Sequence, residues 1–313
     1  MTLFTVELTR DKGRIRAFLE RDRLWGAYAL GDLEPALFAH CLWGVASNAR
    51  GDVALVLLFE ALTPPGLLTF GDPQAVVALL SKALQPPQVF FMIETEHLAA
   101  LRELYAVGPL DPMLRMVVDP TTFRPAAAPR SLPGKGAGGL GVFDLSPTPS
   151  PGKGGGLRKG EVTSPLPPPS FLGKGAGGLG QVRRITPADL NALNTLYAGG
   201  ETPGAFAPFQ IEQGVFYGVE LDGRLVAAAG THLVAPSEGV AAVGNVYTDR
   251  AYRGRGLAQM CTSAVVAHCF DLGIRDVVLN VDSRNAPAIA AYRRLGFRQH
   301  RAFYEARGER MRE

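Results

Sequence analysis

The stretch YRGRGLA at residues 252–258 stands between a strand-like run and a helix-like run. Residues 239–247 (GVAAVGNVY) before it are rich in apolar and β-branched side chains, which is typical of a strand. After it, apolar residues recur at helical spacing until Gly273, a residue suited to end a helix. These apolar residues are Leu257, Met260, Cys261, Ala264, Val265 and Leu272. The stretch is therefore expected to be a short turn that opens a helix.

A glycine-containing turn at the start of a helix leaves several backbone N–H groups without partners. Together with the positive end of the helix dipole, these amides form an anion site that suits a pyrophosphate. Arg253 and Arg255 add positive charge beside the turn, although either residue also fits as a solvated loop arginine. The turn therefore predicts an anion-binding site.

The turn resembles the acyl-CoA-binding loop of the GNAT superfamily of N-acetyltransferases, whose pattern is Arg/Gln-x-x-Gly-x-Gly/Ala. Arg253, Gly256 and Ala258 occupy its three defined positions. The order of the following segments also resembles the family: a buried strand at residues 276–281, then an asparagine, then a short helix that carries a tyrosine. The resemblance extends over residues 182–306.

This resemblance implies a fold of the α/β class with a mixed sheet, the GNAT acyl-CoA N-acyltransferase fold. It also implies acetyl-CoA as the acyl donor and direct attack of a primary amine on the thioester in a ternary complex. In the family, the strand before the loop holds the pantetheine through its backbone and the loop holds the pyrophosphate. The implied cofactor-binding residues are Val246, Tyr247, Thr248, Arg253, Gly254, Arg255, Gly256, Leu257, Ala258, Asn285 and Tyr292.

Two residues are candidates for acid–base chemistry. By its family position, Tyr292 would give a proton to the departing thiolate. A helix aromatic packed on the sheet is the competing interpretation, and the family position favours the functional one. Relatives often place a glutamate where this chain has Asn245, so His232 is the best remaining base. A structural histidine is the competing interpretation for His232, and a helix N-cap is the competing role for Asn285.

Composition limits the classes of function. With 313 residues, 47% of them hydrophobic and 19% charged, the chain can bury a large core and is expected to form two domains. A net charge of +3 does not indicate nucleic-acid binding. No apolar run is long enough to span a membrane, and no signal-peptide pattern is present. Three cysteines without paired spacing indicate reduced thiols and a cytoplasmic protein, and no metal-ligand spacing is found.

Residues 124–181 differ in kind from the rest of the chain. They are dominated by Gly, Pro, Ser and Lys, and they repeat GKGAGGLG at residues 134–141 and 173–180. So few large apolar side chains cannot offset the entropy of ordering such a segment, which is expected to be a disordered linker. The G-x-G-x-x-G pattern within each repeat lacks the strand and helix that a dinucleotide site needs.

Residues 1–123 form a second predicted domain. Strand-like runs at residues 4–8, 53–59, 67–70, 89–93 and 114–118 alternate with helical runs at residues 11–30, 74–84 and 97–105. This order resembles the same fold, which implies a tandem protein with a degenerate N-terminal copy and a catalytic domain at residues 182–313. Where the loop should fall, residues 69–73 (TFGDP) lack its pattern, and Asp72 would place a carboxylate near the pyrophosphate space. The N-terminal half is therefore expected not to bind CoA.

The sequence leaves the acceptor open. A small amine or amino-acid-like molecule is favoured over a protein, with no nucleic acid and no membrane as partner. Either a monomer or a homodimer is compatible, since tandem copies can mimic a dimer. The alternative function is a non-catalytic module that binds acyl-CoA or other proteins, and Arg253 to Gly256 would support CoA binding under both interpretations.

Overall fold

A computed structural model describes residues 4–126, 181–199 and 206–311 of the protein. Both halves of the chain contribute to one continuous sheet, in the order β1-β2-β3-β4-β5-β13-β7-β12-β11-β10-β9-β8 with β6 paired to β13. The predicted linker and its repeats fall largely outside the described residues. Within them, no helix is long and apolar enough to cross a membrane.

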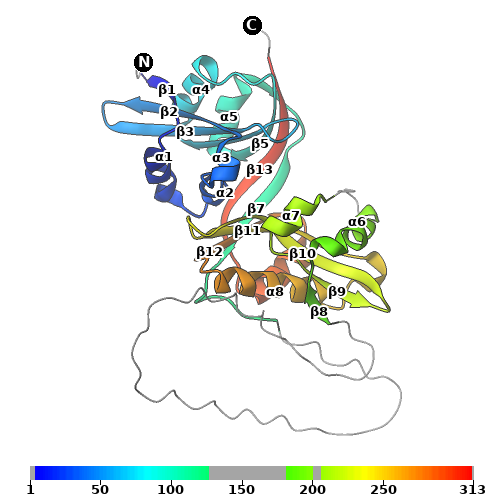
Figure 1. Ribbon diagram of the computed structural model, residues 1–313. Helices are drawn as coiled ribbons and strands as arrows, with labels where there is room; N and C mark the ends of the chain where they lie inside the picture. The colour runs from blue at the N-terminus through cyan, green and yellow to red at the C-terminus, as the bar shows by residue number, and fades with distance from the viewer. Residues whose placement is uncertain (1–3, 127–180, 200–205, 312–313) are drawn as a thin grey trace, which may run out of the picture.

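The N-terminal half forms the upper part of the molecule in Figure 1. Its strands are β1 (Thr5–Thr9), β2 (Cys41–Asn48), β3 (Gly51–Phe59), β4 (Gly66–Gly71), β5 (Gln88–Glu94), β6 (Tyr105–Val107) and β7 (Asp111–Val118). Its helices are α1 (Lys12–Leu19), η1 (Glu20–Asp22), α2 (Ala27–Gly31), α3 (Pro35–Phe38), α4 (Pro73–Lys82), η2 (Thr95–His97) and α5 (Leu98–Arg102).

The C-terminal half forms the lower part of the same view. Its strands are β8 (Val182–Arg184), β9 (Tyr217–Leu221), β10 (Arg224–Ala235), β11 (Val240–Thr248), β12 (Asp276–Asp282) and β13 (Arg298–Arg310). Its helices are η3 (Pro187–Asp189), α6 (Leu190–Ala198), α7 (Pro208–Gln213), η4 (Arg250–Tyr252), α8 (Leu257–Asp271) and α9 (Ala286–Arg294).

The two halves exchange their last strands. Strand β7 leaves the N-terminal half and pairs with β12 of the C-terminal half, while β13 returns to pair with β5 of the N-terminal half. These two strands also pair with each other, and they run between the two parts of the molecule in Figure 1. Each half therefore needs a strand from the other to complete its sheet.

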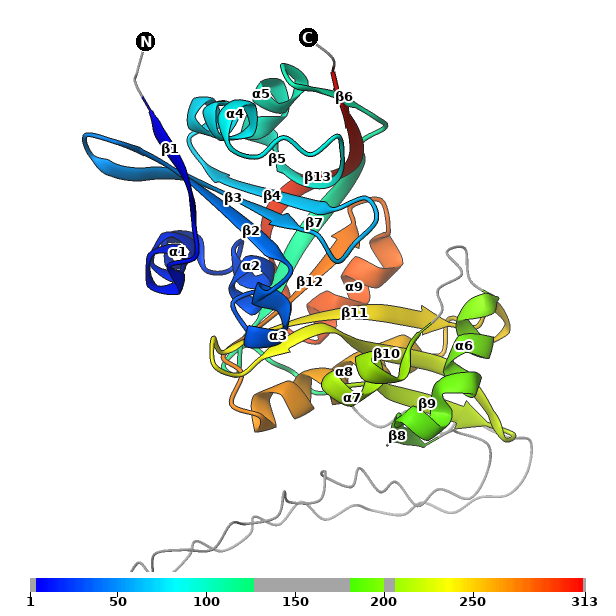
Figure 2. The ribbon, with the colours of Figure 1, turned by 45° about the horizontal axis from the view of Figure 1, so that its top comes forward.

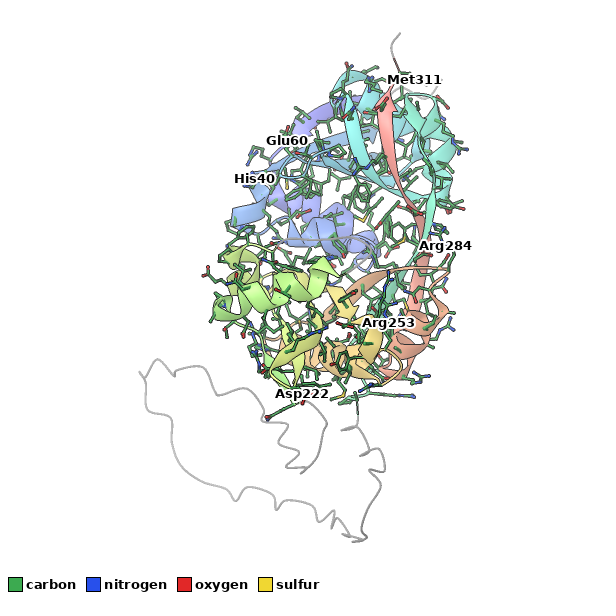
Figure 3. The ribbon with its side chains drawn as sticks, turned by 90° about the vertical axis from the view of Figure 1, so that its right-hand side faces the viewer. His40, Glu60, Asp222, Arg253, Arg284 and Met311 are labelled. Atoms are coloured by element: carbon green, nitrogen blue, oxygen red, sulfur yellow. The ribbon has the colours of Figure 1, made fainter. Side chains whose placement is uncertain are left out.

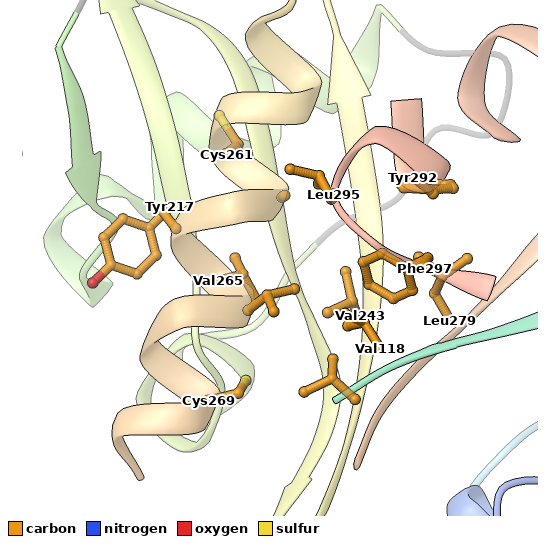
Figure 4. Packing of buried hydrophobic residues seen from close by; sticks show 14 of the residues in the cluster. Val118, Tyr217, Val243, Cys261, Val265, Cys269, Leu279, Tyr292, Leu295 and Phe297 are labelled. Carbon is orange, nitrogen blue, oxygen red and sulfur yellow. The ribbon is translucent and has the colours of Figure 1, made fainter. Parts of the chain in front are cut away.

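Helices cover both faces of the sheet. Helices α8 and α9 pack with one face of the C-terminal strands, and Figure 4 shows Cys261, Val265 and Cys269 of α8 directed toward them. Side chains on the opposite face join α1, α2 and α3 to strands of both halves, including Leu57 of β3 and Val278 of β12. Because this apolar cluster spans the junction, hydrophobic burial holds the halves together.

Ion pairs reinforce the junction. Arg16 of α1 donates to Glu238 at 2.8 Å, and Arg23 donates to Asp276 of β12 at 2.7 Å. Helix α2 contacts β10 and β11, and it lies beside those strands in Figure 2. The contact is close, since a Cβ added to Gly31 of α2 would lie 2.6 Å from a methyl group of Leu233. The N-terminal helices thus lie directly against the C-terminal sheet.

Most predicted elements are confirmed, but the structure also differs from the prediction. The helical run predicted for residues 11–30 is divided into α1, η1 and α2. Strands β2 and β6 and helices α3 and α7 were not predicted. Asp222 and Gly223 form the turn between β9 and β10, and both have the positive φ that such a hairpin turn requires. Gly273 follows α8 with φ 80°, as a helix-ending glycine does.

Candidate active site

The candidate site begins at the split between β11 and β12, which is the place where these two parallel strands stop pairing and separate. Strand β11 pairs with β12 only from Val240 to Val243, whose partner is Leu279. Beyond Val243, β11 continues to Thr248 with pairs to β10 alone. One edge of residues 244–248 therefore lacks strand partners, so its backbone groups are free to bind an extended amide-containing ligand.

A bulge lies at the opening of this split. Asn245 has φ 50°, and the β10–β11 register shifts on either side of Gly230. The Tyr197 hydroxyl of α6 donates a hydrogen bond to the Asn245 carbonyl oxygen. Tyr247 stacks near Tyr197, with ring centroids 5.4 Å apart, and donates to the Gly199 carbonyl oxygen at 2.9 Å. The bulge thus fixes the course of β11 past its last pair with β12.

The predicted turn follows β11 directly. Gly254 and Gly256 have φ of 77° and 76°, and both are exposed with open space around them. Gly256 is the N-cap of α8 and has no side chain to cap the helix. Leu257 is buried in the core and anchors the first turn. An uncapped, exposed N-terminus of a 15-residue helix is an anion site, because its first amides lack partners within the helix.

Two arginines and a threonine surround the turn. Arg253 donates from Nε to the Thr248 carbonyl oxygen at 3.2 Å, and Arg255 lies over the ring of Tyr252. Arg253 belongs to the C-terminal half, far from His40 and Glu60 in Figure 3. The Thr248 hydroxyl is buried and has no hydrogen-bond partner among the described residues. Positive charge and an unpaired hydroxyl therefore lie where the strand meets the turn.

Helix α9 brings the second group of predicted residues. Asn285 caps this helix, since its side chain accepts a hydrogen bond from the Ala288 amide at 3.2 Å. The capping role is thus present, and the Nδ2 group donates no hydrogen bond to any of the described residues. Tyr292 is 9% exposed and lies beside Leu295 and Phe297 in Figure 4. Burial raises the pKa of Tyr292 to about 12, so its phenol stays protonated at neutral pH.

Tyr292 lies close to the split. Its phenol interacts electrostatically with Tyr197, which is bonded to the bulge at Asn245. Gly296 allows the chain after α9 to lie against the segment that follows β7, because a Cβ at this position would lie 1.9 Å from the Thr122 carbonyl oxygen. The arrangement can therefore present a hydroxyl donor to a group bound between β11 and β12.

His232 lies on the other side of the split. A Cβ added to Gly244 would lie 2.2 Å from its Nε2 atom, so the imidazole covers Gly244 at the point where β11 leaves β12. The His232 side chain is solvent-exposed. The protein around it displaces water and lowers its pKa, while a hydrogen bond to Asn245 raises that pKa by a smaller amount. Its Nδ1 atom is 3.1 Å from the hydroxyl of Tyr28 in α2.

A buried arginine of the N-terminal half lies next to this pair. Arg115 of β7 is completely buried, and burial lowers its pKa to about 10. Its guanidinium lies 4.7 Å from the Tyr28 ring centroid and donates to Asn280 at 2.6 Å. It also donates to the Leu24 and Trp25 carbonyl oxygens at 3.2 and 3.0 Å. Arg115 thus connects the start of α2 to β12 just past the last pair with β11.

Two residues at this site, Arg115 and Tyr28, were not predicted from the sequence. The sequence offered a signal for Arg115, since a charge within the apolar run of β7 must find partners when buried. Tyr28 offered none, because it lies 204 residues from His232 along the chain. The structure brings Tyr292, Asn285, His232 and the turn residues around one split, as the sequence placed them along neighbouring elements.

The N-terminal half contains the same kind of split, but it is filled. Strands β4 and β5 are parallel and pair only from Gly66 to Leu68 of β4. His97 occupies the end of β4, with Nδ1 2.9 Å from the Thr69 hydroxyl and Nε2 2.8 Å from the Gly71 carbonyl oxygen. The following helix, α4, is capped by Asp72, whose side chain accepts from the Ala75 amide at 2.9 Å. A carboxylate thus occupies the N-terminus of α4, whereas the N-terminus of α8 has no side-chain cap.

Residues 190–297 match the model of the acetyltransferase (GNAT) family, so this part of the chain is a GNAT acetyltransferase domain. Among curated proteins, the mycothiol acetyltransferase of Tsukamurella paurometabola is 30% identical over 135 residues, which cover 36% of this chain and 46% of the relative. The chain thus spans less than half the length of that relative in the match.

Solved structures share the fold over nearly the whole chain. A GCN5-related N-acetyltransferase from Sphaerobacter thermophilus has a TM-score of 0.56 at 17% identity and covers 99% of this chain and 96% of its own. A tandem GNAT protein from the clavulanic acid biosynthesis pathway has a TM-score of 0.52 at 13% identity, with coverage of 97% and 98%. The predicted mixed-sheet GNAT fold is therefore confirmed.

Metal chemistry has no evident site among the described residues. No group of three or more His, Cys, Asp or Glu side chains there is placed to hold a metal ion. The three cysteines, Cys41, Cys261 and Cys269, are buried free thiols, and burial raises their pKa.

Proposed function

We propose that the protein is an acyl-CoA-dependent N-acyltransferase that transfers acetyl from acetyl-CoA to a primary amine of a small molecule. One observation carries the proposal: the uncapped N-terminus of α8 lies directly after a strand edge that has lost its partner. The edge suits the amides of pantetheine, and the helix N-terminus suits the pyrophosphate. The family match and the names of the curated relatives support the same chemistry.

In this proposal, acetyl-CoA is held mainly by main-chain groups. Val246, Tyr247 and Thr248 bind the pantetheine along the free edge of β11. The turn residues Arg253 to Ala258 bind the pyrophosphate, which explains why two glycines with positive φ precede α8. Asn285 and Tyr292 approach from α9 on the β12 side. No side-chain carboxylate is needed for cofactor binding.

The transfer step forms a C–N bond and breaks the C–S bond of the thioester. The acceptor amine loses one proton before attack and a second when the amide forms, and the departing thiolate takes up one proton. Charge developing on the carbonyl oxygen is stabilised by backbone N–H groups at the split. The products are an N-acetyl amide and free CoA, with one proton released to solvent for each ammonium group consumed.

Tyr292 serves the departing sulfur in this scheme. A phenol with a pKa of about 12 is a weaker acid than a thiol, whose pKa is about 8.5. Complete proton transfer from Tyr292 to the thiolate is therefore uphill. Its role is that of a hydrogen-bond donor that stabilises the developing thiolate, while solvent supplies the proton.

His232 is the proposed base for the amine. An ammonium group with a pKa near 10 must lose a proton before it attacks, and a neutral imidazole is available for that at neutral pH. Protein around His232 lowers its pKa, which keeps the imidazole neutral. Because the side chain is exposed beside the split, an acceptor can reach it.

The acceptor and the organisation of the chain complete the proposal. We favour a small amine, since the curated relatives are named for a small-molecule acceptor. We also propose that residues 1–123 and 182–313 are tandem copies of one fold, in which only the second binds CoA. Matching parallel splits in the two halves, one filled by His97 and one open, support this division.

Titration of acetyl-CoA into the full-length protein by calorimetry tests the proposal. One site per chain is expected, and an amine panel assayed by release of free CoA thiol should then yield an acceptor. Two sites would refute the proposal that the N-terminal half, with its filled split, does not bind CoA. Absence of binding at millimolar acetyl-CoA would refute the cofactor assignment. Binding without transfer to any amine would favour a non-catalytic acyl-CoA-binding module.

A further inference from the structure

The pair formed by Tyr28 and His232 joins the two halves at the candidate site. The Tyr28 hydroxyl is 3.1 Å from Nδ1 of His232, and the two rings are tilted by 52° with centroids 6.2 Å apart. Tyr28 belongs to α2 of the N-terminal half, whereas His232 belongs to β10 of the C-terminal half. A residue of the half that lacks an open split therefore contacts the proposed base.

The surroundings hold Tyr28 in one orientation. The Arg115 guanidinium lies 4.7 Å from its ring centroid, and Arg115 itself is tied to the carbonyl oxygens of Leu24 and Trp25, just before α2. Arg115 also donates to Asn280 of β12 at 2.6 Å. A tyrosine packed against a fully buried, anchored cation has little freedom to turn away. The hydroxyl is thus presented to His232 by a rigid support.

The position of the imidazole decides which nitrogen can act. Nε2 lies over Gly244, the first residue of β11 beyond its last pair with β12. A neutral imidazole carries one N–H, so the nitrogen that does not hold the proton keeps the free lone pair. For Nε2 to accept a proton at the split, Nδ1 must carry the N–H and donate it to an acceptor. The Tyr28 oxygen is the acceptor within reach.

We propose that Tyr28 is a positioning residue that holds the His232 imidazole in the Nδ1–H form, so that Nε2 faces the split with a free lone pair. This inference rests on the proposed acyl transfer, in which His232 is the base. A hydrogen bond to Asn245 favours the charged imidazole that forms when Nε2 takes a proton. The N-terminal half then takes part in the acid–base step, and its role is not limited to forming a wall of the site.

Other ionisable groups surround the pair. Asp32 just after α2, Arg115 of β7 and Glu305 of β13 all act electrostatically on Tyr28. Burial raises the pKa of Asp32 and of Glu305 to about 7, so both change charge near neutral pH. A titration of His232 must therefore be compared between variants that leave these three groups unchanged. Tyr28→Phe meets this condition, because it keeps the ring on Arg115 and removes only the hydroxyl.

Nitrogen-15 NMR of histidine-labelled full-length protein tests the inference without any substrate. The chain has five histidines, and His232→Gln identifies the His232 signals by their loss. Above its titration, wild-type His232 should show a protonated Nδ1 and an unprotonated Nε2. Tyr28→Phe should increase the Nε2–H form and lower the titration midpoint by up to about one pH unit, because the charged imidazole loses one hydrogen-bond acceptor.

A matched control removes a buried hydroxyl elsewhere in the same half. The Tyr105 hydroxyl donates to the Pro86 carbonyl oxygen at 3.1 Å, and Tyr105→Phe should leave the His232 signals as in the wild type. An Nε2–H form in the wild-type protein would overturn the inference. Unchanged signals and an unchanged midpoint in Tyr28→Phe would overturn it as well. Acetyl-CoA titration of the same samples tests the proposed function separately, so the two failures are distinguishable.

Discussion

Gly256→Asp places a carboxylate at the N-terminus of α8, where the proposal puts the pyrophosphate of acetyl-CoA. The N-terminal half shows what such a residue does, because Asp72 caps α4 by accepting from the Ala75 amide. An aspartate at position 256 adds the same negative charge, and its side chain can compete for the free amides of the first turn. The variant should therefore fold and lose affinity for acetyl-CoA.

The size of the loss follows from two contributions. A helix N-terminus stabilises an anion by about 1 kcal/mol, and this contribution is lost if the new carboxylate occupies the amides. Repulsion between two unit charges about 4 Å apart is about 1 kcal/mol in water and about 4 kcal/mol near a protein surface. Gly256 is exposed, so about 2 kcal/mol is a reasonable intermediate value. The total of about 3 kcal/mol corresponds to a Kd raised about 100-fold.

Calorimetric titration of acetyl-CoA measures this change, with Gly51→Asp as the control. Gly51 also has a positive φ, is exposed and has open space around its Cβ direction, but it lies at the start of β3 in the N-terminal half. The control carries the same added charge and a similar backbone strain, and its Kd should remain within about twofold of wild type because surface charges far from the ligand are screened. Equal affinity of Gly256→Asp and wild type would refute the assignment of the turn.

Three further predictions concern single residues. Tyr292→Phe should lower kcat about 10- to 100-fold at unchanged acetyl-CoA affinity, since a hydrogen bond to a charged group contributes about 1.5–3 kcal/mol; an unchanged kcat would remove Tyr292 from the mechanism. Gly296→Ala should reduce stability by about 3 kcal/mol in denaturant unfolding, because its Cβ would lie 1.9 Å from the Thr122 oxygen. Gly273→Ala is the control, with a similar φ and no clash, and equal losses in both would contradict the docking argument. Burial lowers the pKa of His97 below its unfolded value of about 6.5, so the unfolded state binds more protons and stability should fall as the pH drops below about 6.5. His97→Gln should reduce this pH dependence of stability, whereas the control His40→Gln, at an exposed position, should keep it. Melting temperatures between pH 5 and pH 8 measure both variants. Identical pH profiles of His97→Gln and wild type would refute the role of His97.

The sequence predicted the parts of the site that depend on local order. The turn at residues 252–258, its two glycines and the helix after it follow from backbone requirements that adjacent residues determine. Asn285 and Tyr292 could be placed for the same reason, because a strand and a short helix carry them to the other side of the split. Local patterns therefore predicted the turn and the helix that border the split, and the cofactor role of these residues stays a prediction.

The acceptor side depends on contacts that no local pattern carries. Tyr28 meets His232 only because α2 lies against β10 and β11, and that contact depends on the exchange of β7 and β13. The exchange could not be predicted either, since β7 and β13 each satisfy the pattern of a last strand in their own half. The pairing of a strand depends on packing and register across the whole sheet, so an apolar run in the sequence does not show which strand it will pair with.

The exchanged strands also explain why an N-terminal half without an open split remains part of the molecule. Strand β7 fills the place between β12 and β13, so removing the N-terminal half would leave β12 with an unpaired edge beside the candidate site. Arg115 lies on that same strand and supports Tyr28 while bonding Asn280 of β12. One strand thus completes the C-terminal sheet and carries the support of the proposed base. The two halves are therefore joined at the level of the site itself, and a change that loosens their junction should disturb His232 before it disturbs the turn that precedes α8.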